Sequence, residues 1–284
     1  MFRLSGCLTL LLSLTASAAI HQDLHDDSHE RSTTAGAASA PEEADFDSAL
    51  RRYGIGRGSE KARILSTWLD AVLRDPAIRK RMPGGARELE HDFLDADKRT
   101  ALISGGLARL TPADRLRYLQ LFTRLLDELV PVNCFGLVDI SAVMNRITIA
   151  QMSDADAELY LDLLYKVLVS GGTDATVRLP TAQQFAAAVE ELSRAIVIEL
   201  HADPVDLERY QFYSTHRSVA TPADVCWTTR VTLHAIAKMP EAERDFVLLP
   251  AITPPGDATL ANPADDAREA PLPSSAGHPA TTLP

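Results

Sequence analysis

The sequence predicts an all-α fold, a bundle or irregular array of seven to nine helices over residues 58–250. Apolar residues recur there every three or four positions, the period of a helix that buries one face. A serine, threonine or aspartate precedes most of these stretches, and proline often follows it, as at a capped helix start. Two short runs have some strand character, but neither predicts a strand. Residues 130–137 contain proline and glycine and have no partner run, and residues 196–198 lie inside a longer helical period.

The N-terminal half of this domain contains three clearly marked helices. Ser59 precedes the first, Thr111 and Pro112 begin the second, which ends before Pro131, and Asp139 caps the third. The apolar stripe of the first helix is Ile64, Leu65, Trp68, Leu69, Val72 and Leu73. That of the second is Leu116, Leu119, Phe122, Leu126 and Leu129, and that of the third is Ile140, Val143, Met144 and Ile147. Each stripe occupies one helical face, so we expect all three helices to contribute to the core.

Four further helices follow in the C-terminal half, each with a recognisable start. The starts are Ser153, the capping box of Thr181 and Gln184, Thr221 with Pro222, and Pro240. The helix after Ser153 has the apolar stripe Tyr160, Leu163, Leu164, Val167 and Leu168, and the helix after Thr181 has Phe185, Val189, Leu192, Ile196 and Leu200. The helix after Thr221 has Trp227 and Val231, and the helix after Pro240 has Phe246 and Val247. A Gly171–Gly172 pair closes the first of these helices.

Two stretches of different composition flank the domain. Residues 19–57 are rich in His, Asp, Ser and Ala, and residues 251–284 are rich in proline. Neither stretch has enough apolar residues to offset its chain entropy, and closely spaced prolines exclude helix and central strand. We therefore expect a flexible linker before the domain and a disordered tail after it.

Residues 1–18 have the layout of a secretory signal peptide. Arg3 supplies the positive charge, residues 8–14 form a short apolar run, and Ala16 and Ala18 satisfy the cleavage rule. The run is shorter than the roughly 20 residues of a membrane span. Arginine far outnumbers lysine, a bias typical of GC-rich bacterial genomes. We expect a periplasmic or secreted chain that has no membrane span after cleavage.

Two cysteines, Cys134 and Cys226, remain after that cleavage. An even pair in an oxidising compartment predicts a disulfide, and two buried free thiols are the alternative.

The composition excludes several classes of function. The net charge of −11 argues against nucleic-acid binding, which needs a basic surface. The chain has no Gly-x-Ser-x-Gly, Walker or His-Glu-x-x-His motif, and we expect no cofactor.

Several histidines and carboxylates are candidates for metal or acid–base chemistry. Glu88, His91 and Asp95 would share a helical face, with Asp92 beside them. Because the second Glu-x-x-His of a bundle metal site is missing, a solvated acidic face is the favoured interpretation, and a metal or acid–base site is the alternative.

Other histidines lie near the C-terminal helices. His201, Asp203 and His216 could form a second cluster, with His201 explained otherwise by the helix end that it follows. His234 shares a face with Trp227, and we expect a core histidine with one satisfied partner.

The segment Arg209–Arg217 concentrates aromatics and arginines in a chain otherwise poor in aromatics. Such residues dominate the energetics of protein interfaces, which predicts a partner-binding surface. The residues of this surface are Arg209, Tyr210, Phe212, Tyr213 and Arg217. The alternative is a connecting segment that packs on the core.

Cleavage after Ala18 would place His21 third from the new N-terminus. A free amine with histidine at that position can bind Cu(II) or Ni(II) in a square plane of nitrogens. A soluble His/Asp-rich tether is the alternative.

Taken together, these patterns favour an exported, non-catalytic helical protein that binds a protein partner, of inhibitor, immunity or assembly-factor type. The alternative is an exported hydrolase with dispersed His and Asp residues, since an active site can assemble from distant positions. The oligomeric state is open at this stage.

Overall fold

The computed structural model describes residues 50–51, 54–85, 96–173, 176–253 and 258–260, with only the backbone of 96–102 and 258–260. This part of the chain contains ten α-helices, eight of them with at least seven residues, and the predicted all-α fold is confirmed. They are α2 (Glu60–Arg74), α3 (Pro76–Arg81), α5 (Ala96–Arg109), α6 (Pro112–Leu129), α7 (Ile140–Met144), α8 (Asp154–Gly171), α9 (Ala182–Glu199), α10 (Pro204–Thr215), α11 (Pro222–Lys238) and α12 (Glu241–Ile252). Two short 3-10 turns, η3 (Cys134–Gly136) and η4 (Arg217–Val219), join them.

Capping hydrogen bonds fix the helix starts that the sequence predicts. The side chains of Ser59, Thr111 and Ser153 each accept a bond from the backbone N–H three residues ahead, at the first turns of α2, α6 and α8. Thr181 does the same for α9, and the Gln184 side chain accepts from the Thr181 N–H to complete the capping box. Local sequence therefore determines where these helices begin.

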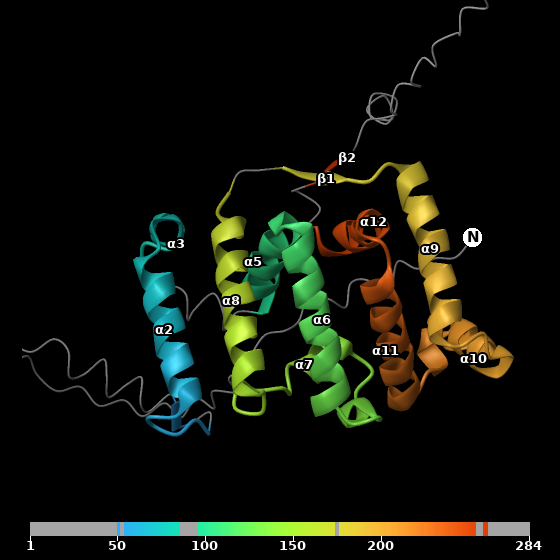
Figure 1. Ribbon diagram of the computed structural model, residues 1–284, viewed down its shortest axis with the longest axis horizontal. Coiled ribbons are helices and arrows are strands. Elements are labelled where there is room, and N and C mark those ends of the chain that lie inside the picture. The colour runs from blue at the N-terminus through green and yellow to red at the C-terminus, as the bar shows by residue number, and fades with distance from the viewer. Residues whose placement is uncertain (1–49, 52–53, 86–95, 174–175, 254–257, 261–284) are drawn as a thin grey trace, which may run out of the picture.

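The helices form an array with α6 at its centre. Figure 1 shows α2, α8, α6, α11 and α9 side by side in that order, and neighbouring helices in this series are in contact. α5 packs chiefly on α8, α12 packs on α9, and α10 lies at the edge of the molecule against α11.

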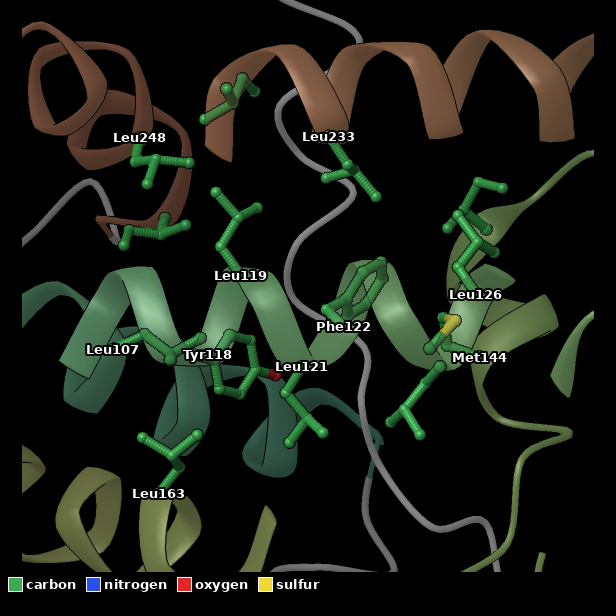
Figure 2. Packing of buried hydrophobic residues seen from close by; sticks show 14 of the residues in the cluster. Leu107, Tyr118, Leu119, Leu121, Phe122, Leu126, Met144, Leu163, Leu233 and Leu248 are labelled. Carbon is green, nitrogen blue, oxygen red and sulfur yellow. The ribbon is translucent and has the colours of Figure 1, made fainter. Parts of the chain in front are cut away.

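Helix α6 supplies the middle of the hydrophobic core. Leu119, Leu121, Phe122, Leu125 and Leu126 are almost completely buried. Figure 2 shows that Leu119 and Leu121 point to different sides of the helix. In Figure 2 they meet side chains from α5, α8, α11 and α12. Its apolar side is broad enough for several neighbouring helices to cover different parts of it, whereas Arg117, Gln120, Asp127 and Glu128 are exposed on the polar side.

Two helices in this array approach unusually closely. Gly106 of α5 faces Val167 of α8, and a Cβ atom on Gly106 would lie 2.2 Å from the Val167 carbonyl oxygen. Only glycine leaves room for this approach, so Gly106 sets the spacing between α5 and α8.

The packed structure extends beyond residues 58–250 at both sides. Leu50 and Ile55, in the range predicted as linker, are buried against Ala62. In the range predicted as a disordered tail, β2 (Ala258–Leu260) pairs in parallel with β1 (Val177–Leu179). The strand pairing joins residues about 80 positions apart, and Ile149 and Ala150, about 95–100 residues later in the chain, pack against the cluster of Leu50, Ile55 and Ala62. Neither stretch has a local pattern long enough to reveal these contacts.

Candidate functional site

The predicted partner-binding segment forms helix α10 and the turn η4 after it. His201 and Ala202 adopt positive φ angles of 54° and 55°, which turn the chain between α9 and α10. The Asp203 side chain then accepts hydrogen bonds from the N–H groups of Val205 and Asp206, and Pro204 occupies the first helical position. Proline suits this position because its fixed φ matches the helix and its missing N–H would have no partner there.

The inward side of α10 rests on α11 through Tyr210, the one residue of α10 that is fully buried. The Tyr210 hydroxyl forms a 2.6 Å hydrogen bond with Thr232, and its ring meets Trp227 edge-on at 6.2 Å between centroids. Tyr210 is only 7% exposed and therefore packs on the core, as the alternative interpretation of this segment expects, and its ring is not presented to a partner.

Arg209 provides the second attachment of α10 to α11. Its guanidinium donates to Asp224 at 2.8 Å and lies 4.4 Å from the centre of the Trp227 ring. Burial alone would raise the pKa of the Asp224 carboxyl, but hydrogen bonds from Arg209 and Thr221 outweigh burial and hold that pKa below its usual range. The carboxylate is therefore ionised at neutral pH and retains Arg209.

The outward side of α10 carries an exposed aromatic group. Phe212 is 46% exposed, stacks on the His216 ring at 4.7 Å and meets Tyr213 edge-on at 5.2 Å. Nδ1 of His216 lies 3.1 Å from the Phe212 carbonyl oxygen and 2.9 Å from the Thr215 hydroxyl. These contacts hold the three rings in a defined arrangement at the C-terminal end of the helix.

Exposed apolar side chains concentrate around this helix. Within the described residues, nine large hydrophobic side chains are exposed, and five of them lie between residues 197 and 219. The five are Val197, Ile198, Val205, Phe212 and Val219. We call these five, together with Tyr213, His216 and Arg217, the α10 surface. Four members of this surface were not expected from the sequence, Val197, Ile198, Val205 and Val219, because their exposure depends on which sides of α9, α10 and η4 turn to the core.

A second, smaller group of exposed apolar residues lies in the loop after α6. Val132, Phe135 and Val138 are exposed there, and Cys134 between them is completely buried. Cys134 is bonded to Cys226 of α11, so the predicted disulfide is present. Cys134 and Phe135 both have positive φ, a conformation that side chains other than glycine rarely adopt.

The predicted cluster of His201, Asp203 and His216 is not assembled. His201 precedes α10 and His216 follows its last residue, so the length of the 12-residue helix, about 18 Å, separates them. Asp203 is used as the N-cap. Glu88, His91, Asp92 and Asp95, and also His21, lie outside the described residues.

His234 has the single partner that the sequence analysis expected, but it is not a core residue. Its Nε2 lies 2.9 Å from Oδ2 of Asp127 on α6, and its side chain is 37% exposed. Arg230 also contacts Asp127 and donates to the backbone carbonyls of Leu126 and Val130. The pair thus belongs to a polar strip that joins α11 to the end of α6.

Other features that could hold a ligand are small in the described structure. No group of three or more His, Cys, Asp or Glu residues within it is arranged to hold a metal ion. A pocket of about 20 Å³ lies between α5, α6 and α12, a volume that suits one water molecule. No described helix has both the length and the apolar character that a membrane crossing requires.

Comparisons of the chain with known protein families, with curated proteins and with solved structures find no match.

Proposed function

We propose that this chain is an exported, non-catalytic protein that acts by binding another protein through the α10 surface, as an inhibitor, immunity protein or assembly factor. The observation that carries this proposal is the concentration of five exposed apolar side chains between residues 197 and 219. A concentration of exposed large apolar side chains on a folded domain is characteristic of a contact site.

The composition of the α10 surface supports the same conclusion. Phe212 and Tyr213 are aromatic, and Arg217 is an exposed arginine beside them. Aromatic residues and arginine are the types enriched among the energetically dominant contacts of protein interfaces. Because Tyr210 and Arg209 fix the inward side of α10, the outward side is presented without a large loss of backbone freedom on binding.

Export is a part of the proposal that rests on the sequence. The layout of residues 1–18 favours a signal peptide, and the Cys134–Cys226 disulfide is consistent with an oxidising compartment.

The hydrolase alternative has one specific observation in its favour. His234 and Asp127 form a histidine–carboxylate pair that is partly open to solvent, an arrangement that can serve acid–base chemistry. An activity that depends on this pair would be abolished in His234→Ala and retained in Phe212→Glu.

A comparative capture experiment tests the proposed function. The mature chain, the variant Phe212→Glu and the control Thr67→Glu, at an exposed position of α2, are immobilised and exposed to a bacterial periplasmic extract. We expect a protein that is retained by the wild type and by Thr67→Glu and is lost with Phe212→Glu. If all three chains are folded and Phe212→Glu retains the same protein as the wild type, the α10 surface is not the contact site.

A further inference from the structure

We propose that the Cys134–Cys226 disulfide is a redox-sensitive clamp on the loop of residues 131–138, and that its reduction releases this loop while the helices on either side stay in place. The loop joins α6 to α7 and presents the exposed apolar side chains of Val132, Phe135 and Val138. The inference concerns this loop alone and does not depend on the α10 surface.

The backbone of the loop adopts a conformation that its side chains disfavour. Cys134, Phe135 and Gly136 have consecutive φ angles of 48°, 53° and 78°. In this left-handed region a Cβ atom crowds the following carbonyl oxygen, which costs nothing at Gly136 but is unfavourable at Cys134 and Phe135. Such a conformation persists only where the surrounding structure holds it. A loop without that support should therefore leave this region.

The disulfide attaches the loop to the core. Of residues 131–138, Cys134 is the one that is fully buried, and Leu137 is partly buried. The turn η3 lies against α11, where Cys226 is also completely buried. Three backbone hydrogen bonds shape the turn, and each of them joins two residues of the loop. These bonds give the loop its shape, and the covalent bond ties that shape to α11.

Both ends of the loop are fixed without the disulfide. Arg230 of α11 donates hydrogen bonds to the carbonyl oxygens of Leu126 and Val130, at the end of α6. At the other end, the Asp139 side chain accepts a hydrogen bond from the Ser141 N–H and caps α7, which contributes to the core. Loss of the disulfide should therefore free the segment between these two anchors and leave α6, α7 and α11 in place.

Thiol–disulfide exchange with a dithiol would operate the clamp. One thiolate of the dithiol attacks Sγ of Cys134 or Cys226 and forms a mixed disulfide, and the second thiolate then displaces that cysteine. The dithiol becomes a disulfide, and its two electrons and two protons remain on Cys134 and Cys226 as thiols. Because both cysteines are completely buried, the exchange requires a transient opening of the loop.

Chymotrypsin digestion of the folded chain measures this release. The oxidised chain is compared with the chain reduced by dithiothreitol, which is then removed in the absence of oxygen. Cleavage after Phe135 and Leu137 should be roughly ten-fold faster or more in the reduced chain. Phe212 on α10 is more exposed than Phe135 and serves as the internal control, which should be cut at an unchanged rate. Cys226→Ala should show the fast loop cleavage without any reductant.

Two substitutions at position 135 test the role of the backbone. Asparagine tolerates positive φ, whereas β-branched valine does not, and both changes remove the chymotrypsin site at this position. Cleavage after Leu137 in the reduced chain should therefore be several-fold slower in Phe135→Asn than in Phe135→Val, because the turn persists longer with asparagine.

Several results would overturn the inference. One is loop cleavage that is the same in the oxidised and the reduced chain. Another is loss of the helical circular dichroism signal on reduction, or an equal acceleration at Phe212, because the bond would then support the whole domain and not one loop. Equal rates in the reduced forms of Phe135→Asn and Phe135→Val would contradict the release of a disfavoured backbone.

Discussion

Substitution of Gly106 by alanine should destabilise the domain, although the same change stabilises most helices. A Cβ atom at this position would lie 2.2 Å from the carbonyl oxygen of Val167 and 2.6 Å from its Cγ1 atom. The oxygen belongs to the backbone of α8 and has no rotamer to escape into. Because an ordinary contact begins near 3.4 Å, α5 and α8 must separate by about 1 Å.

The size of the effect follows from two opposing terms. Alanine in a helix interior gains about 1 kcal/mol over glycine, whereas overpacking of this kind costs about 1–3 kcal/mol or more. We expect a net loss of roughly 1–2 kcal/mol, because the separation weakens packing along the whole α5–α8 contact. For a domain of this size the midpoint of thermal unfolding should fall by about 2–8 °C.

Gly171 provides a matched control in the same pair of helices. A Cβ atom there would lie 2.7 Å from the guanidinium nitrogen of Arg81, the far end of a flexible side chain that can move. Gly171→Ala should therefore change the free energy of unfolding by no more than about 0.5 kcal/mol. Urea unfolding followed by circular dichroism measures both variants. A Gly106→Ala protein as stable as the wild type would refute the close approach of α5 and α8.

Three further predictions concern the disulfide, a buried carboxylate and the N-terminus. Cys134 and Cys226 should give no thiol reaction in the denatured, unreduced protein, and two reactive thiols there would contradict the disulfide. Because the bond closes a loop of 92 residues, its reduction should lower the free energy of unfolding by about 4–5 kcal/mol. The Asp224 carboxyl has a depressed pKa in the folded state, so its contribution to stability is present above about pH 4 and is lost as the pH falls further. Arg209→Gln removes the ion pair and should make the free energy of unfolding less dependent on pH in that range. An unchanged pH profile would contradict the pairing of Arg209 with Asp224. If N-terminal sequencing shows that the mature chain begins at Ala19, Cu(II) should bind at one tight site and give a violet absorption band that His21→Ala abolishes. The same Cu(II) titration for the wild type and for His21→Ala would contradict this site.

The sequence predicts the helices of this fold well because their determinants are local. Thr111 and Pro112 start α6, and its apolar residues recur at the helical period, so a short window of residues contains the whole signal. The disulfide could also be predicted, because only two cysteines follow residues 1–18.

The remaining features depend on contacts between residues that are far apart in the sequence. β1 pairs with β2 over about 80 residues, and three residues per strand carry no periodic pattern. Asp127, the partner of His234, lies 107 residues earlier in the chain. The burial of Tyr210 and the exposure of Phe212 depend on which side of α10 meets α11. Residue types singled out residues 209–217, which contribute Phe212, Tyr213, His216 and Arg217 to the α10 surface. Only the fold shows that Tyr210 is buried and that the other apolar members of this surface are exposed.

The central claim is that the outward face of α10 is where this protein contacts another. Hydroxyl-radical footprinting tests it most directly, because it compares the solvent exposure of individual rings in the free and the associated protein. Phe212 should be oxidised several-fold more slowly when the captured protein is bound than in the free chain. Phe185 on α9, which is 37% exposed, should react at the same rate in both states. Equal oxidation of Phe212 in the free and associated states would contradict the account.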